Sequence, residues 1–254
     1  MAGVVEVRGV KIGEGIPKII VPIVGVTKEE IVGAARALAG ARKDLVEWRA
    51  DWFENVMDFE EVELVLGELR AVISEVPLLF TFRTGAEGGE KEISREAYAA
   101  LTIRAAHSGL VDLIDVEAFI GDETVHEITA AAHAAGVKIV ASNHDFDRTP
   151  VKEEILKRLC RMQELGADIC KIAVMPCCKR DVLVLLSATQ EMVADYADRP
   201  VITMSMGGTG LISRLCGEVF GSACTFGAVG KASAPGQIGA SDLGTVLDLI
   251  HGSL

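Results

Sequence analysis

Eight short runs of apolar and β-branched residues recur along this chain at intervals of roughly 30 residues, the spacing of successive βα units. The runs are 18–25, 45–50, 78–83, 113–117, 138–146, 168–174, 201–206 and 224–230. Each run is followed by a stretch with helical periodicity, and such units form parallel strands joined by right-handed crossovers. The 254-residue length suits a single barrel domain. The sequence therefore predicts an α/β fold, a (β/α)8 TIM barrel spanning residues 1–254.

An open doubly wound sheet is the competing arrangement for alternating strands and helices. Such sheets usually begin with a glycine-rich nucleotide-binding turn, whereas the first turn here reads GVTKEE. Residues 4–15 precede the first run and have the pattern of a β-hairpin. We expect this hairpin to cap the N-terminal mouth at the bottom of the barrel.

Two helix starts carry recognisable capping chemistry. Thr27 and Glu30 have the spacing of a capping box. Thr149 and Pro150 read as an N-cap followed by the first residue of a helix.

The charge balance and the cysteine usage restrict the classes of partner and compartment. A formal net charge of −12 repels phosphate backbones, so nucleic acid is not expected as a partner. The sequence contains no run of 18 uncharged apolar residues, so a membrane span is not predicted. The six cysteines show no paired CxxC spacing, which favours reduced thiols in a cytoplasmic protein.

Several of the predicted strands carry polar side chains that share one face with apolar ones. Side chains two residues apart in a strand lie on the same face. The shared sets are Leu45 with Glu47 and Arg49, Leu79 with Thr81 and Arg83, Leu113 with Asp115 and Glu117, Val140 with Ser142 and His144, and Ile169 with Lys171 and Ala173. If this face points into the barrel, the polar groups converge near the C-terminal mouth, where barrel active sites lie.

Lys171 is the sharpest of these observations, because it interrupts an otherwise apolar strand. Burial disfavours the charged form of a lysine, and a neutral amine can attack a ketone to form an imine. The alternative is a structural lysine that is ion-paired inside the barrel, for example to Glu117. The strand by itself does not decide between the two interpretations.

The other candidate residues are ambiguous when each is taken alone. His144 at a strand end can move protons near neutral pH, or it can simply bond a backbone carbonyl or Asp145. Glu87 in the glycine-rich RTGAEGGE loop is by composition a solvated acid. The remaining candidates could be an ordinary helix cation, plain loop residues and core packing: Arg214, Ser233, Gln237, Met204 and Met206.

An ordered set of motifs makes the chain resemble the type I 3-dehydroquinate dehydratases. The motifs are EWRAD, TFRTGAEGGE, LIDVE, NHDF, KIAVMP, SMG, the SR that contains Arg214, and SAPGQ, after the opening VRGVKIGEGIPKIIVPI. The resemblance covers essentially the whole chain. No single fragment is decisive, but the ordered set is highly specific.

The resemblance implies a lyase that dehydrates 3-dehydroquinate to 3-dehydroshikimate in the shikimate pathway, without a metal or an organic cofactor. In it, Lys171 matches the Schiff-base lysine, His144 the general acid and base, and Glu87 the acid that orients this histidine. One histidine acting as base and then as acid implies a syn elimination. The residues that match substrate and framework positions are Glu47, Arg49, Arg83, Arg214, Ser233 and Gln237, with Met204, Met206 and Phe226 as the apolar wall.

The chain departs from the family pattern at one position, and two alternative functions remain open. Some members carry a serine where this chain has Pro22, which puts one substrate contact in doubt. The alternatives to a dehydratase are another Schiff-base barrel of the class I aldolase type and a non-catalytic barrel that binds a small anion. The resemblance further implies a homodimer. The charge and the hydropathy pattern, not the resemblance, are the reason to expect no nucleic-acid or membrane partner.

Overall fold

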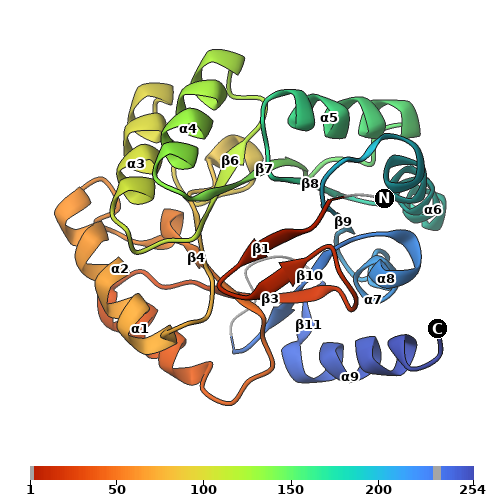
Figure 1. The fold of residues 1–254 in the computed structure, drawn as a ribbon, viewed down its shortest axis with the longest axis horizontal. Helices are drawn as coiled ribbons and strands as arrows, with labels where there is room; N and C mark the ends of the chain where they lie inside the picture. The colour runs from red at the N-terminus through yellow and green to blue at the C-terminus, as the bar shows by residue number, and fades with distance from the viewer. Residues whose placement is uncertain (1–2, 231–235) are drawn as a thin grey trace.

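Eight parallel strands form a closed barrel in the computed structural model, which describes residues 3–230 and 236–254 (Figure 1). The barrel strands are β3 (Lys18–Ile23), β4 (Leu45–Arg49), β5 (Leu78–Thr81), β6 (Leu113–Glu117), β7 (Lys138–Asp145), β8 (Ile169–Val174), β9 (Val201–Ser205) and β10 (Cys224–Ala228). They follow one another in chain order around the sheet, and β11 (Ile238–Gly239) extends it beside β10. The ring closes where Val201 forms a parallel bridge with Ser222. The predicted (β/α)8 barrel is therefore confirmed.

Helices cover the outside of the barrel (Figure 1). They are α1 (Lys28–Ala37), α2 (Phe59–Ile73), α3 (Arg95–His107), α4 (Asp122–Ala134), α5 (Lys152–Glu164), α6 (Lys179–Glu191), α7 (Ile212–Leu215), α8 (Gly217–Phe220) and α9 (Ala240–His251), with single turns η1 (Ala50–Trp52), η2 (Gly85–Glu87) and η3 (Met192–Tyr196). The unit after β9 departs from regular alternation, because two short helices, α7 and α8, follow it. Within the described parts of the chain, no helix is both long and apolar enough to cross a membrane.

The two faces of each barrel strand pack into different cores. In β4, Val46 and Trp48 face the surrounding helices, whereas Leu45 faces the barrel interior. The lowest inward residues of the strands form one apolar layer: Ile20, Leu45, Leu79, Leu113, Val140, Ile169, Ile202 and Cys224. The polar inward side chains begin two residues further along the strands, toward their carboxyl ends.

The N-terminal hairpin closes the bottom of the barrel, as the sequence predicts. Strands β1 (Val5–Val7) and β2 (Val10–Ile12) pair in antiparallel fashion. Val7 and Ile12 pack into the apolar layer inside the barrel. At the turn, Arg8 has a positive φ and pairs with Asp112 through its Nε at 2.6 Å. The hairpin thus seals the lower mouth and leaves the upper mouth for the site.

One predicted helix start is confirmed and one is wrong. The Thr27 side chain accepts from Glu30 N at the start of α1, and the Glu30 carboxylate accepts from Val26 N. Helix α5, however, begins at Lys152 with Val151 as its N-cap, not at Thr149 and Pro150. The Thr149 hydroxyl instead donates to Met175 O at 3.0 Å, so a tertiary contact has taken the group that would cap the helix.

Candidate active site

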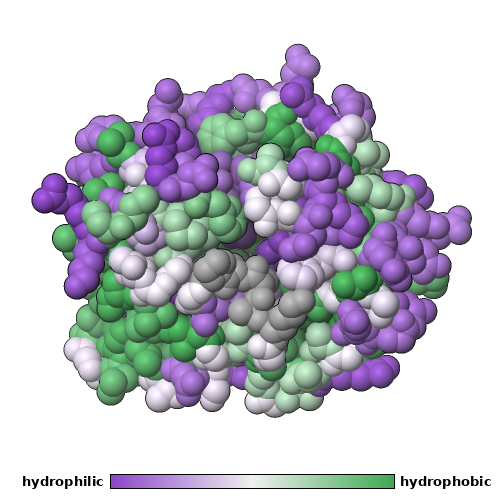
Figure 2. Space-filling model, turned by 180° about the vertical axis from the view of Figure 1, so that it is seen from behind, coloured by the Kyte–Doolittle hydropathy of each residue, from purple (hydrophilic) through white to green (hydrophobic). Residues whose placement is uncertain are grey.

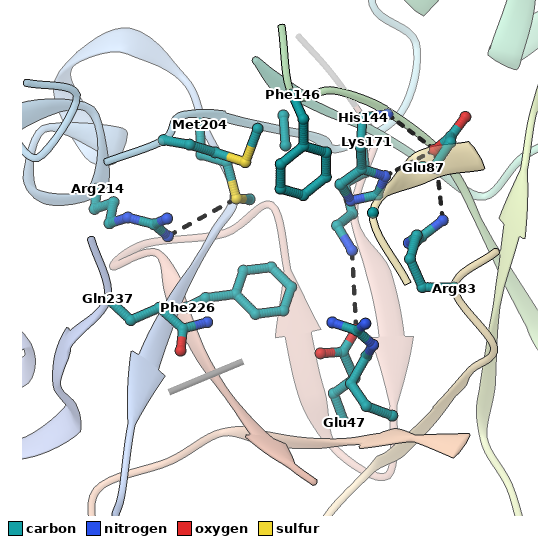
Figure 3. Close-up of a pocket in the computed structure, with 14 residues that line it drawn as sticks. Glu47, Arg83, Glu87, His144, Phe146, Lys171, Met204, Arg214, Phe226 and Gln237 are labelled. Atoms are coloured by element: carbon teal, nitrogen blue, oxygen red, sulfur yellow. Dashed lines mark hydrogen bonds and ion pairs between the residues drawn. The ribbon is translucent and has the colours of Figure 1, made fainter. Parts of the chain in front are cut away.

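A pocket opens at the carboxyl ends of the barrel strands (Figure 3). The predicted site residues that line it are Glu47, Arg49, Arg83, Glu87, His144, Lys171, Met204, Met206, Arg214, Phe226 and Gln237. Ser233, which was also predicted, lies outside the described residues. The fold therefore brings together side chains that are up to 190 residues apart, from Glu47 to Gln237 (237 − 47 = 190).

Lys171 projects from the middle of β8 into this pocket. Its Nζ lies 3.0 Å from Asp115 Oδ2 and 3.9 Å from Glu47 Oε1. The same atom lies 4.8 Å from the centre of the Phe226 ring. The lysine is therefore buried and ion-paired, and it also points into the pocket. Its partner is Asp115, not Glu117, which the sequence suggested as an example.

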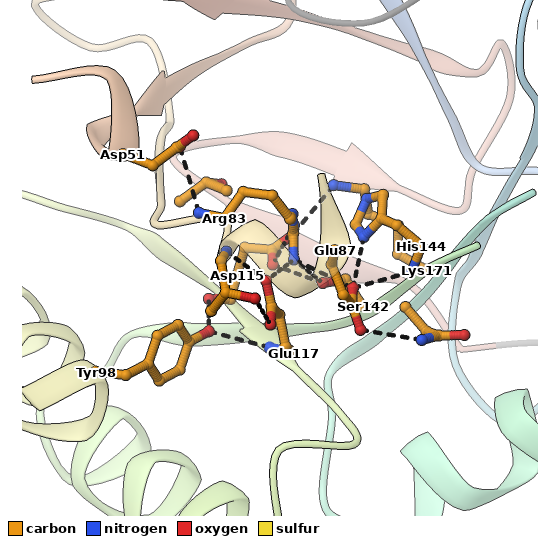
Figure 4. A network of polar contacts seen from close by, with 12 residues as sticks. Asp51, Arg83, Glu87, Tyr98, Asp115, Glu117, Ser142, His144 and Lys171 are labelled. Carbon is orange, nitrogen blue, oxygen red and sulfur yellow. Dashed lines mark hydrogen bonds and ion pairs between the residues drawn. The ribbon is translucent and has the colours of Figure 1, made fainter. Parts of the chain in front are cut away.

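Asp115 holds the centre of a buried polar network (Figure 4). Its Oδ1 accepts from Arg83 Nη2 at 2.7 Å and from Ser142 Oγ at 2.6 Å, while Oδ2 faces Lys171. Burial acts to raise the pKa of this carboxyl, but the charges of Arg83 and Lys171 outweigh it and lower the pKa to about 2. A fixed negative charge therefore lies beside the Lys171 amine.

Arg83 is a framework residue of this network. Its Nη1 donates to Glu117 Oε1 at 3.0 Å and its Nη2 to Asp115. Glu117 also accepts from the backbone N and the hydroxyl of Thr84, both at 2.8 Å. Burial acts against the charge of Arg83, yet the neighbouring carboxylates raise its pKa well above the ordinary value. Arg83 thus remains a cation that ties β5 to β6.

The glycine-rich loop after β5 brings Glu87 back over the barrel. Gly88 has φ of 82°, a conformation that side chains rarely adopt. A Cβ at Gly89 would lie 1.9 Å from Arg83 O. The loop can therefore fold tightly only with glycine at these two positions, and this fold turns the Glu87 carboxylate toward β7.

Glu87 holds His144 at the end of β7. Glu87 Oε2 accepts from the backbone N of His144 and lies 2.9 Å from its Nδ1. A carboxylate at Nδ1 keeps a proton on that nitrogen, which leaves Nε2 to exchange a proton with a ligand. Burial, with Arg83 and Lys171, lowers the pKa of His144 well below the ordinary value, so the ring is neutral near pH 7. Burial raises the pKa of Glu87 to about 7 against the opposing charge of Arg83.

Glu47 and Arg49 enter the pocket from β4. Arg49 makes a two-pronged ion pair with Asp51, with Nε to Oδ1 and Nη2 to Oδ2 both at 2.8 Å. Glu47 Oε1 accepts from Thr81 Oγ1 at 2.9 Å. Both side chains are thus oriented by neighbours while they still line the pocket.

The opposite side of the pocket is mainly apolar. Met204 of β9, Met206 directly after β9 and Phe226 of β10 line it. Arg214 of α7 lies at this wall with its Nη1 3.8 Å from Met204 Sδ, and burial lowers the pKa of its guanidinium to about 10. Arg214 is still a cation at neutral pH. The pocket thus combines a charged half, an apolar half and the cation of Arg214, which suits a small organic anion with both polar and apolar parts.

The comparisons with known proteins agree with this geometry. A family model described as "Type I 3-dehydroquinase" matches residues 19–253. The chain belongs to this family. A protein of Clostridioides difficile (strain 630) named 3-dehydroquinate dehydratase is 59% identical over 250 residues, which cover 98% of each chain.

Solved structures of 3-dehydroquinate dehydratases share the fold over nearly the whole chain. The type I 3-dehydroquinate dehydratase from Clostridium difficile has a TM-score of 0.98 at 58% identity, with 100% of both chains covered. The 3-dehydroquinate dehydratase from Geobacillus kaustophilus HTA426 has a TM-score of 0.96 at 39% identity, with 98% of this chain and 97% of that chain covered. A Schiff-base mechanism is characteristic of type I 3-dehydroquinases, but class I aldolases share it. The match to the dehydroquinase family is what disfavours the class I aldolase alternative.

Two residues of this 3-dehydroquinase site were not selected from its sequence. Asp115 was predicted to share the inward face of β6 with Glu117, but no role in the site was assigned to it. Phe146 follows β7, and its ring stacks on that of His144 at 6.4 Å between centroids. A half-exposed phenylalanine after a strand carries no comparable signal.

Pro22 is the one position at which the sequence departs from the family pattern described above. It lies in β3, in register with Glu47 of β4. Within the described parts of the chain, the pocket lining does not include Pro22.

Proposed function

We propose that this type I 3-dehydroquinase dehydrates 3-dehydroquinate to 3-dehydroshikimate, a step of the shikimate pathway, by syn elimination through a Schiff base on Lys171. The observation that carries the proposal is the Lys171 amine, buried beside Asp115 in a pocket that also holds His144 backed by Glu87. Relatives named 3-dehydroquinate dehydratase at 55% to 59% identity support the choice of substrate.

The first chemical step is imine formation. The ammonium of Lys171 gives up a proton, and the free amine attacks the ring ketone. The carbonyl oxygen takes up two of the three ammonium protons and leaves as water, so that C=O is replaced by a protonated C=N. Asp115 keeps a negative charge near this nitrogen. The protonated imine draws electrons from the adjacent carbon, which makes the hydrogen on that carbon acidic.

The second step is elimination, for which His144 is placed. Its Nε2 takes the proton from the adjacent carbon, and the electron pair of the C–H bond forms an enamine. The enamine then expels the β-hydroxyl, which receives the proton back from His144 and leaves as water. Proton and hydroxyl depart from the same face because one imidazole serves both. Hydrolysis of the product imine releases 3-dehydroshikimate and restores Lys171.

The rest of the pocket is proposed to bind the substrate. Arg214 is the cation for the substrate carboxylate, since it lies at the apolar wall away from the cluster of acids around Lys171. Glu47 and Arg49 face the hydroxyls, and Arg83 maintains the framework. The loop residues Ser233 and Gln237 are assigned to closing over the substrate, with Met204, Met206 and Phe226 as the wall for the ring.

Borohydride trapping tests this proposal. Sodium borohydride is added to the protein with 3-dehydroquinate, and the modified peptide is located by mass spectrometry. We expect a reduced adduct on Lys171 that is absent without substrate and absent from the Lys171→Ala variant. No adduct, or an adduct on another lysine, would exclude the mechanism. Anti elimination from stereospecifically deuterated substrate would exclude the role of His144 as both base and acid.

We also propose that the enzyme is a cytoplasmic homodimer, each copy a single barrel domain. All six cysteines are free thiols, in keeping with a reducing compartment. Helices α7 and α9 lie on the right in Figure 1 and therefore on the left in Figure 2, which views the molecule from behind. Figure 2 shows hydrophobic surface gathered on that left side. The exposed apolar side chains there include Ile212 and Leu249. Light scattering on the purified protein tests the dimer, and a mass of one chain would refute it.

A further inference from the structure

Asn143 joins the proposed catalytic pair to a cation on the outside of the barrel. It lies in β7 on the face opposite Ser142 and His144, and its side chain is 8% exposed. Asn143 Nδ2 donates to Glu87 Oε1 at 3.0 Å, and Asn143 Oδ1 accepts from Arg158 Nη1 at 3.0 Å. A single amide therefore connects helix α5 with the loop that carries Glu87.

The two partners permit one orientation of the Asn143 amide. The reverse orientation would place the amide oxygen against the Glu87 carboxylate and the NH2 group against a guanidinium. Arg158 is itself fixed, because its Nε donates to Glu154 Oε1 at 2.8 Å and its Nη1 lies 3.7 Å from Asp145 Oδ2. The direction of the amide thus follows from the charges of Arg158 on α5 and of Glu87 in η2.

The oxygens of Glu87 are divided between two neighbours. Oε1 accepts from Asn143, whereas Oε2 accepts from the backbone of His144 and faces its Nδ1. We propose that Asn143, oriented by Arg158, is a positioning residue that keeps Glu87 ionised and aligned, so that His144 carries its proton on Nδ1 and a free lone pair on Nε2. This inference rests on the proposed roles of Glu87 and His144.

The surroundings of Glu87 make its ionisation sensitive to one hydrogen bond. It faces Arg83 after β5, Glu92 and Arg95 at an outer pocket, Asp115 and Glu117 on β6, His144 on β7 and, across the main pocket, Lys171 on β8. Burial raises the pKa of Glu87 most, Arg83 lowers it, the β6 carboxylates raise it and the Asn143 hydrogen bond lowers it. The net result is a pKa of about 7.

Loss of the hydrogen bond from Asn143 therefore raises the pKa of Glu87, which already lies near neutral pH. A protonated Glu87 would donate to Nδ1 of His144 and force the tautomer with its proton on Nε2. That tautomer has no lone pair toward the substrate and cannot act as a base.

The test is the pH dependence of kcat for matched variants of the full enzyme. Asn143→Asp keeps the shape of the side chain but replaces the donor with an acceptor. We expect its acid limb to move up by about one pH unit, with kcat about tenfold lower near pH 6 and KM within about twofold of the wild type. In Arg158→Ala the acid limb should move in the same direction by a smaller amount. In Arg158→Lys it should return to its wild-type position.

Lys157→Ala is the matched control, since it removes an exposed cation from the same helix. Its profile should superimpose on that of the wild type. A second readout is the 15N NMR signal of the His144 ring, which should show more Nε2–H tautomer in Asn143→Asp.

The outcomes separate this inference from the proposed function. A wild-type enzyme that is active and trapped on Lys171, with unshifted limbs in both Asn143→Asp and Arg158→Ala, would overturn the inference alone. A wild type without activity or without the Lys171 adduct would overturn the proposed function. If Asn143→Asp does not fold, the half-buried Arg158 series decides, and an unshifted limb in Arg158→Ala counts against the inference.

Discussion

Lys171 Nζ lies 3.0 Å from Asp115 Oδ2, and neither side chain is more than 5% exposed. Asp115 is also bonded to Arg83 and Ser142, so its carboxylate cannot turn away from the lysine without losing both contacts. The pair places a fixed negative charge next to the nitrogen that a Schiff base would make positive. A charge oriented in advance in this way stabilises the charged intermediate without reorganisation.

Asp115→Asn should therefore impair both catalysis and stability. We expect kcat to fall about 100-fold, because a neutral amide no longer compensates the imine charge. The free energy of unfolding should fall by about 3 kcal/mol, since two buried cations lose a carboxylate. Steady-state kinetics and urea unfolding measure the two effects, with the exposed Asp147→Asn as control. An unchanged kcat would show that Asp115 is a structural partner alone.

Lys171→Ala should abolish turnover while leaving the barrel folded. The substitution removes the nucleophile, and Asp115 retains Arg83 and Ser142 as partners. The far-ultraviolet circular dichroism spectrum should match that of the wild type, and conversion of 3-dehydroquinate should fall to background. Residual turnover with normal stereochemistry would point to a mechanism without an imine at this position.

The pH dependence of kcat should show an acid limb that belongs to Glu87. Burial raises the pKa of Glu87 to about 7, so the carboxylate is present above this pH and lost below it. The pKa of His144 is lowered well below 6.5, so this ring stays neutral and adds no limb near neutral pH. We expect kcat to fall about tenfold per unit below about pH 7.

Glu87→Gln provides the control for this limb. A glutamine cannot ionise, so the acid limb should disappear while the plateau falls, by about 100-fold. The measurement is kcat between about pH 5.5 and 9, a range that spans the histidine and raised-carboxylate titrations. An acid limb that persists unchanged in Glu87→Gln would assign it to another group.

Arg214 should control substrate affinity more than the chemical step. It is a buried cation at the apolar wall, and a guanidinium binds a carboxylate through two parallel hydrogen bonds. Arg214→Ala should raise KM about 100-fold, and Arg214→Lys should raise it less because it keeps the charge but not the planar fork. Arg180→Ala, an exposed cation on α6, should leave KM unchanged. A fall in kcat with unchanged KM would contradict this role.

The barrel and the inward strand residues of the pocket could be predicted because both follow from periodicity within single strands. Glu87, Arg214 and Gln237 lie outside the barrel strands and were predicted only through the resemblance to the family. The inward placement of Lys171 and His144 follows from alternation alone once the strands are parallel. The start of α5 could not be predicted, because the Thr149 hydroxyl bonds Met175 in another unit. The choice of Asp115 over Glu117 as the lysine partner depends on strand stagger and on Arg83, which local sequence does not encode.

Ile12→Ala should destabilise the barrel without affecting the site. Ile12 is fully buried against the lowest inward layer, so truncation leaves a cavity at the bottom of the barrel. We expect the free energy of unfolding to fall by about 3 kcal/mol, which urea titration measures. Because the pocket lies at the opposite mouth, kcat and KM should stay within about twofold of the wild type, a change below about 0.5 kcal/mol. Lys11→Ala, on the exposed side of the same strand, is the control. A large loss of activity at unchanged stability would mean that the hairpin acts on the site directly rather than as a plug.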